Sequence, residues 1–252
     1  GKCIAHRTGA CPEGFSVDRR TARGVVPRRG SRTAVSDAPA NPVERSGVLQ
    51  LFPTQVWASQ LRAAFYEPLN EAILRRLDAL RPAEALGQWQ TRQDLHLDPA
   101  FAPLVQVLRQ TARGICDALT LLYDDVQVTG CWANVSEHGQ PHRPHIHPNN
   151  FLSGAYYVKT GAGADAIRFH DPRMQAGMIV PPARDQNRAN PDTMTLDVRP
   201  GMLVMFPAWL QHSVPPNLSD ESRVSVAFNL MFPSFGTTMA SPMWTGDTPG
   251  QT

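Results

Sequence analysis

The chain has 252 residues, of which 42% are hydrophobic and 18% are charged, and its formal net charge is +2. This size and apolar content allow one large β domain or two small ones. The near-neutral charge gives no reason to expect nucleic-acid or membrane binding, and no run of about 18 apolar residues predicts a membrane span. The four cysteines are too few and too scattered for a disulfide framework, so we expect reduced thiols in a cytoplasmic protein. The four cysteines are Cys3, Cys11, Cys116 and Cys131.

The two ends of the chain differ in composition from its middle. Residues 1–47 are rich in Arg, Gly, Pro, Ser and Ala and show little hydrophobic periodicity. Such a composition is typical of disorder, so we expect a disordered N-terminal extension. Residues 48–232 are expected to form the folded domain, and residues 233–252 a C-terminal tail or an interface arm.

Two helices are expected near the start of the folded domain, at residues 60–82 and 99–122. Apolar residues recur in both segments at helical spacing, which predicts stripes that cover a sheet. Asp98 before Pro99 is typical of a helix cap followed by a proline in the first turn. We assign no chemistry to these helices.

From Val126 onward the chain consists of short segments rich in β-branched and aromatic residues, separated by Gly, Pro and Asn turns. Eight such strands predict a mainly β fold with flanking helices, a double-stranded β-helix or jelly roll. The long segment Asp171–Asp192 is a candidate lid or substrate loop. The expected strands are Val126–Val135, His142–His147, Leu152–Lys159, Asp165–His170, Thr193–Val198, Met202–Phe206, Leu210–Val214 and Arg223–Met231.

His145 and His147 are the most informative pair of residues in the chain. Side chains alternate along a strand, so two residues spaced i, i+2 project from the same face. His212 follows the expected strand Met202–Phe206 and a proline turn, and a returning strand would bring it beside the pair. Neutral imidazoles bind Fe, Zn, Cu and Ni. The spacing therefore predicts a metal site, although clustering by chance among eight histidines is the alternative.

Arg223 and Ser225 repeat the i, i+2 spacing on a strand whose other face is apolar. The polar face is expected to line a cavity, and a guanidinium held there needs an anionic partner. Arg suits two-pronged binding of a carboxylate, and Ser225 can add a hydroxyl donor. The alternative is an ion pair between Arg223 and Asp220 or Glu221 at the start of the strand.

Together these residues resemble the Fe(II)/2-oxoglutarate-dependent oxygenase superfamily, whose pattern is His-x-Asp/Glu, a distal His, and then Arg-x-Ser. Roughly residues 48–232 are similar to a group of bacterial and phage 2-oxoglutarate/iron oxygenases of unassigned substrate. The shared stretches are Leu51-Phe-Pro-Thr54, Trp132-Ala-Asn134, Leu152-Ser-Gly-Ala-Tyr-Tyr-Val158, Phe169-His-Asp-Pro172, Phe206-Pro-Ala-Trp-Leu210 and Arg223-Val-Ser-Val-Ala-Phe-Asn229.

The resemblance implies Fe(II) as the metal, with His145, His147 and His212 as its ligands and the catalytic group. The sequence departs from the superfamily pattern at His147, where a residue with a carboxylate usually stands. His147 is the favoured third ligand, but Asp171 could supply a carboxylate, or two histidines alone could bind. His170 is a further candidate.

The resemblance also implies 2-oxoglutarate as the co-substrate. Its distal carboxylate is expected to contact Arg223, Ser225 and the phenol of Tyr157, while Asn134 contacts the co-substrate or the substrate. O2 and a small-molecule substrate complete the expected reaction. That reaction is hydroxylation of an unactivated C–H bond of a small molecule or an amino-acid side chain, with release of succinate and CO2. The sequence leaves the substrate and the oligomeric state open.

Two other classes of protein compete with this interpretation. A cupin-type metalloenzyme that uses no 2-oxoglutarate shares the spacing from Gly139 to the paired histidines. However, the glutamate expected a few residues later is absent, and Arg223 and Ser225 stay unexplained. A non-catalytic jelly roll that binds a ligand or a structural metal is the other alternative. A structural zinc site prefers four protein ligands, whereas the sequence offers three.

Overall fold

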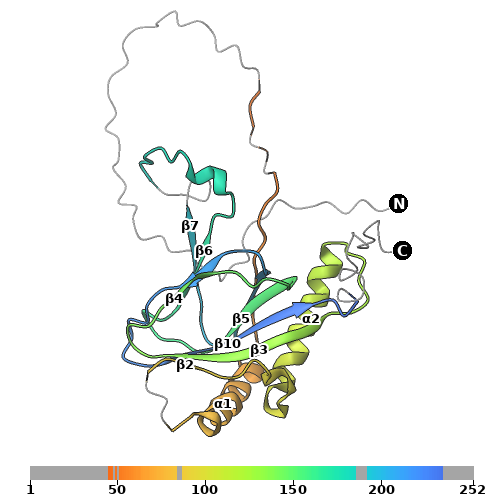
Figure 1. The fold of residues 1–252 in the computed structure, drawn as a ribbon, viewed down its shortest axis with the longest axis vertical. Coiled ribbons are helices and arrows are strands. Elements are labelled where there is room, and N and C mark those ends of the chain that lie inside the picture. Colours follow the sequence, from red (N-terminus) through yellow and green to blue (C-terminus); the bar gives the residue numbers. More distant parts are fainter. Residues whose placement is uncertain (1–44, 48, 50, 84–86, 186–191, 235–252) are drawn as a thin grey trace, which may run out of the picture.

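A computed structural model describes residues 45–47, 49, 51–83, 87–185 and 192–234. The expected extension at 1–47 and tail at 233–252 therefore lie almost entirely outside the described residues. Within them, two antiparallel sheets form the jelly roll (Figure 1). The larger sheet has the order β1 (Trp57–Gln60), β8 (Met202–Pro207), β5 (Leu152–Lys159), β10 (Arg223–Met231), β3 (Gln127–Ser136) and β2 (Trp89–Gln90). The smaller has the order β4 (His142–His145), β9 (His212–Val214), β6 (Ala166–His170) and β7 (Thr193–Asp197).

Two helices pack against one face of the larger sheet, α1 (Ala63–Leu80) and α2 (Ala102–Ala118) (Figure 1). Both lie within the ranges expected from their apolar stripes. Asp98 does act as a cap, since its carboxylate accepts a hydrogen bond from the backbone N–H of Ala100 at 3.0 Å. The segment that it caps is a short 3-10 turn, η2 (Pro99–Phe101), and α2 begins only after that turn. Another 3-10 turn, η1 (Leu95–Leu97), precedes it.

Alternation along the central strands divides the core into two layers. On β10, the apolar side chains of Val224, Val226, Phe228 and Leu230 pack with the helices in the larger cluster. On β8, Leu203 and Met205 join the same cluster. The alternate residues Met202, Val204 and Phe206 pack with Ile167 and Phe169 of β6, between the sheets. The other face of β10 is thus free to carry polar residues into the space between the two sheets.

A buried hydrogen-bonded pair fixes α1 on the larger sheet. The phenol of Tyr156 on β5 donates to the side-chain oxygen of Asn70 at 2.6 Å, and the Asn70 amide donates to the carbonyl of Val158 at 2.9 Å. Close contact also requires glycine on the same strand. A Cβ on Gly154 would lie 2.3 Å from the carbonyl oxygen of Val204 and 2.4 Å from the ring of Phe228.

The structure differs from the expected elements in several places. β1 and β2 were not expected, and β2 is only two residues long, too short for a periodic pattern. Leu51 and Phe52, in the first of the stretches shared with the resembled group, are 73% and 96% exposed and do not join the core. The expected strand at 142–147 ends at His145.

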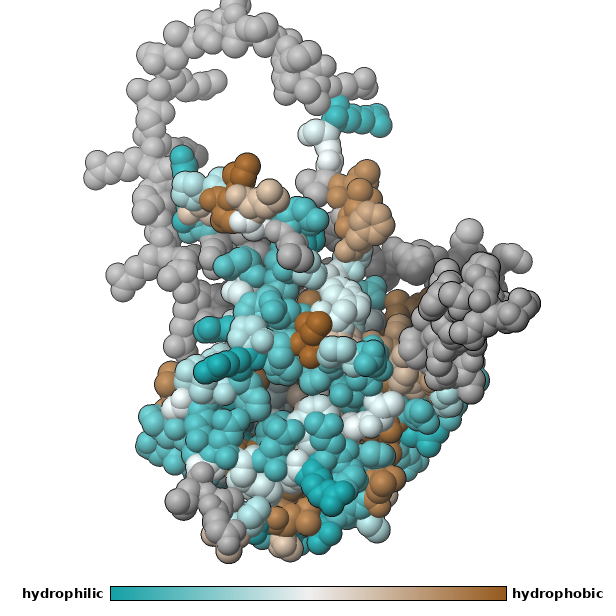
Figure 2. Space-filling model, viewed as in Figure 1, coloured by the Kyte–Doolittle hydropathy of each residue, from teal (hydrophilic) through white to brown (hydrophobic). Residues whose placement is uncertain are grey.

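The segment from 171 to 192 follows β6 and contains a 3-10 turn, η3 (Met174–Gly177). Residues 186–191 lie outside the described part of the chain. After η3 the side chains of Met178, Ile179 and Val180 are exposed. Figure 2 shows a face that is mostly hydrophilic, with several separate hydrophobic patches. None of the described helices is long and apolar enough to cross a membrane.

Candidate metal centre and co-substrate pocket

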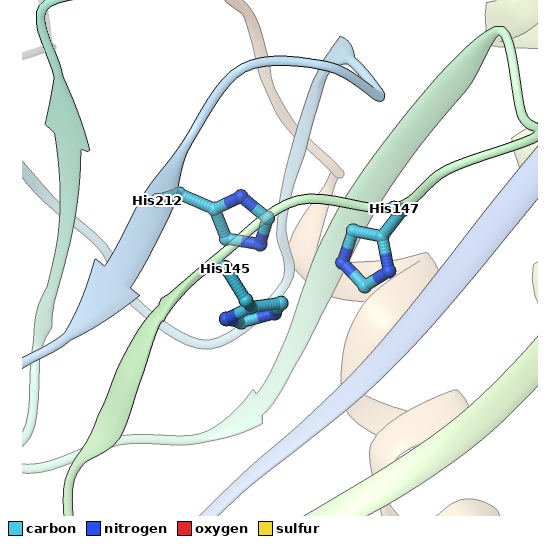
Figure 3. A group of neighbouring side chains, drawn as sticks. All are labelled: His145, His147 and His212. Carbon is cyan, nitrogen blue, oxygen red and sulfur yellow. The ribbon is translucent and has the colours of Figure 1, made fainter.

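Three histidines converge between the two sheets (Figure 3). His145 ends β4 and pairs with His212 at the start of β9, so the ladder itself places these two side by side. His147 lies beyond the end of β4, contrary to the expectation that it shares a strand face with His145. Its position is fixed instead by its backbone N–H, which donates to the carbonyl of Ala208 at 2.9 Å. A bent loop therefore brings it to the same point.

The three imidazoles have the geometry of a metal-binding group. One ring nitrogen from each of the three lies within 4.8 Å of the others. Nδ1 of His145 lies 2.8 Å from the carbonyl oxygen of Arg143, and Nδ1 of His212 lies 3.0 Å from that of Leu210. A carbonyl oxygen only accepts, so Nδ1 of each neutral ring carries the proton and Nε2 keeps its lone pair for a ligand.

Burial favours the uncharged form of His212 and His147. Desolvation lowers the pKa of His212 to about 3, although the Leu210 carbonyl partly opposes the shift. Desolvation, with the nearby His145, also lowers the pKa of His147 to about 4. Aromatic rings supply this apolar environment. Phe206 lies 4.5 Å from His212 and Trp132 lies 5.7 Å from His147, measured between ring centroids. Neutral imidazole is the form that binds a metal.

The structure also bears on the other ligand candidates. Asp171 is occupied by Arg173, with an N–O distance of 2.6 Å, and it does not line the cavity that contains the three histidines. Nε2 of His170 lies 2.9 Å from the hydroxyl of Ser213, and His170 is not part of the histidine group. Only the arrangement with His147 as the third residue brings three ligand atoms together among the described residues.

A buried cation lies in the same cavity. The Arg223 side chain points between the sheets, and the residue is only 3% exposed. One of its terminal nitrogens, Nη1, donates to the carbonyl of Pro215 at 3.3 Å, while the buried Nη2 has no hydrogen-bond partner. Glu221, one partner in the alternative ion pair, instead pairs with Lys159 at 3.0 Å. Burying a guanidinium with an unpaired N–H group costs free energy unless an anion accepts its hydrogen bonds.

The remaining expected residues form one row across three strands of the larger sheet. Ser225 of β10 lies opposite Tyr157 of β5 on one side and opposite Asn134 of β3 on the other. All three line the cavity with Arg223. Burial raises the pKa of the Tyr157 phenol, although the charge of Arg223 works against the shift. The phenol therefore stays protonated and can donate a hydrogen bond.

The cavity has a volume of about 480 Å³ and extends from Arg223 past the histidines to Asn229. At that second end, the hydroxyl of Ser153 donates to the side-chain oxygen of Asn229 at 2.7 Å. Gln90 and Gln93 line the cavity as well, and sequence reasoning missed both. Neither carried a signal in the sequence, because β2 is only two residues long and too short to show periodicity.

The fold and this cavity place the chain in the class of jelly-roll proteins with a histidine-lined site. Residues 130–229 match the model of the family described as "Putative 2OG-Fe(II) oxygenase", and this range includes all of the site residues expected from the sequence. The family resemblance named from the sequence is thereby confirmed, and Fe(II) and 2-oxoglutarate are the cofactor and co-substrate of that family. No curated protein sequence matches the chain.

Solved structures confirm the fold class. A prolyl-4-hydroxylase from Pseudomonas putida is 17% identical, with a TM-score of 0.50, over 71% of this chain and 93% of its own. HygX from Streptomyces hygroscopicus, solved with nickel and 2-oxoglutarate, is 11% identical, with a TM-score of 0.51, over 71% and 84%. The epimerase SnoN, solved with Fe3+, alpha ketoglutarate and nogalamycin RO, is 16% identical, with a TM-score of 0.52, over 79% and 89%. At this identity they establish the shared jelly roll only.

Proposed function

We propose that this chain is an Fe(II)- and 2-oxoglutarate-dependent oxygenase that hydroxylates an unactivated C–H bond of a small molecule or an amino-acid side chain. The observation that carries the proposal is the unpartnered Nη2 of Arg223 in the cavity that also holds three converging imidazoles. A metal alone would not need the guanidinium. A keto acid with a second carboxylate would bind the metal through its keto acid end and pair with the guanidinium through the second carboxylate.

The residues present fit the two groups that the proposal requires. Imidazole nitrogens are good ligands for Fe(II), and the proposed ligands are His145, His147 and His212. Three protein ligands would leave room at the metal for the keto acid end of 2-oxoglutarate and for O2. The distal carboxylate of 2-oxoglutarate would accept hydrogen bonds from the Arg223 guanidinium, with the hydroxyl of Ser225 and the phenol of Tyr157 as further donors.

When bound, Fe(II) and 2-oxoglutarate supply the oxidising power, with O2 giving one oxygen atom to succinate and one to the substrate as CO2 leaves. The chain's own residues bind and orient. The carbonyls of Arg143 and Leu210 hold two rings in the ligating tautomer. Phe206 and Trp132 exclude water beside the histidines, and Asn134 is placed to contact the co-substrate or the substrate.

A screen for succinate release tests the proposal. The protein, loaded with Fe(II), is incubated with O2, 2-oxoglutarate and pools of small metabolites and peptides. We expect succinate to form in proportion to an oxidised product, and only with the cognate pool. Turnover that needs the metal but not 2-oxoglutarate would instead support a cupin-type enzyme. Tightly held zinc with no turnover in excess Fe(II) would support a non-catalytic binding protein.

A further inference from the structure

No acidic side chain faces the cavity in the described part of the chain. Its ionisable lining consists of Arg223, Tyr157 and histidines, and the other polar residues are neutral amides and hydroxyls. Two acidic residues that flank strands of the site are engaged elsewhere. Asp171 follows β6 and pairs with Arg173, and Glu221 precedes β10 and pairs with Lys159. Neither carboxylate lines the cavity.

The outer contacts of the histidines bring no negative charge either. Metal-bound histidines often donate their second nitrogen to a carboxylate, which adds a negative charge just behind the ligand. Here His145 faces the backbone carbonyl of Arg143 and His212 faces that of Leu210. Backbone carbonyls orient the rings but leave the formal charge of the site unchanged. The positive charge of a bound metal must therefore be balanced by the molecules that enter the cavity.

Counting formal charges shows what remains. A divalent metal brings two positive charges to three neutral imidazoles, and the keto acid end of 2-oxoglutarate returns one negative charge. The distal carboxylate is matched by the buried guanidinium of Arg223. One positive charge is then left beside the metal in a half-enclosed cavity lined by aromatic rings. An unmatched charge removed from water is expensive, and a nearby anion is the direct remedy.

We infer that this cavity takes a second anion beside the metal, in addition to 2-oxoglutarate. The inference rests on the proposed function. The ligand is a monovalent anion, either a small inorganic ion or a carboxylate carried by the substrate. The cavity has room for it, since its volume is about 480 Å³ and the amides of Gln93 and Asn229 line it at the end away from Arg223. Amide N–H groups at that end can donate to an anion without adding charge.

The test measures binding and does not depend on turnover. The full chain is loaded anaerobically with Fe(II) and 2-oxoglutarate, and its visible charge-transfer absorption is recorded. Sodium chloride and sodium acetate are then titrated separately at constant ionic strength. We expect a saturable change in the absorption with at least one of them. Binding of chloride identifies an inorganic ion as sufficient, whereas binding of acetate alone identifies a carboxylate group as the ligand.

A pair of variants at one position separates charge from shape. His147→Asp places a negative charge beside the metal, and His147→Asn has nearly the same shape without that charge. We expect the Asp variant to bind the anion about tenfold or more weakly than the Asn variant, because a fixed like charge repels it. Equal affinities in these two variants would overturn the inference.

The unmodified chain keeps the inference falsifiable if both variants lose the metal. If the unmodified chain binds Fe(II) and 2-oxoglutarate but neither chloride nor acetate changes the absorption, the second anion site does not exist. If it binds no 2-oxoglutarate at all, the proposed function fails first, and the inference falls with it.

Discussion

His145 and His212 are direct partners in the ladder between β4 and β9, and their ring centroids lie 4.3 Å apart. The ladder leaves little freedom in how these rings meet, because each Nδ1 is also fixed by a carbonyl two residues earlier. His147 completes the group from a loop held by Ala208. The site is therefore built mainly by backbone hydrogen bonds.

Removing one ligand should abolish metal binding without unfolding the chain. We expect His212→Ala to lower Fe(II) or Co(II) affinity by more than about 100-fold, since even outer contacts of a ligand contribute up to that much. Isothermal titration gives the affinity. His170→Ala is the matched control, because His170 lies nearby but bonds to Ser213. Loss of the metal in the His170 variant would mean that the ligand set is wrongly assigned.

Removing the buried guanidinium should weaken 2-oxoglutarate binding and spare the metal. We expect Arg223→Ala to cost about 2–4 kcal/mol of binding free energy, as for loss of a buried charged hydrogen-bonding partner. Arg223→Lys should recover only part of this, because an ammonium lacks the two-pronged geometry. The exposed Arg168 on β6 provides the control, as Arg168→Ala. Unchanged binding by Arg223→Ala contradicts the assigned role.

Two glycines should respond to alanine in opposite directions. Gly154→Ala places a Cβ 2.3 Å from the Val204 carbonyl oxygen, so the strands must move apart, and we expect a loss of about 1–3 kcal/mol or more in unfolding free energy. A Cβ added to Gly114 in α2 would meet no atom within 4 Å. Gly114→Ala should gain about 0.5–1 kcal/mol from helix propensity. Urea denaturation measures both, and a tolerated Gly154→Ala would refute the close packing of β5.

Asp98 should make stability depend on pH. Hydrogen bonds from the Ala100 N–H and from Arg76 lower its pKa below the ordinary value of 3.8. The ionised form is therefore favoured in the folded state, and the stabilisation is present above that value and lost as pH falls through the lowered pKa. Asp98→Asn should destabilise the protein at pH 7, and its deficit should shrink as the pH approaches 3. A deficit that is constant with pH would contradict this account.

The sequence predicted the central strands and the polar face of β10 because both depend on a period of two. Arg223 and Ser225 point into the cavity for that reason, while Val224 and Val226 pack under the helices. The apolar stripes of α1 and α2 were equally visible. The order of neighbouring strands could not be predicted from the sequence, because Ser225 pairs with Tyr157 and Asn134 only through a register set by distant segments.

Other parts of the site depend on contacts that no local pattern records. His147 was expected on a strand, but the strand ends before it, and a bond to Ala208 sets its position. Gln90 and Gln93 lie on or near a strand of two residues, which carries no periodic signal. The carbonyl partners of the histidines are backbone atoms, so their identity cannot appear in residue types.

The most direct measurement of the central claim is the anaerobic titration of the purified chain with Fe(II) and 2-oxoglutarate. The account predicts one metal and one 2-oxoglutarate per chain, together with a weak visible charge-transfer absorption that needs both components and disappears in Arg223→Ala. Binding of the metal without any absorption or affinity change on addition of 2-oxoglutarate would contradict it.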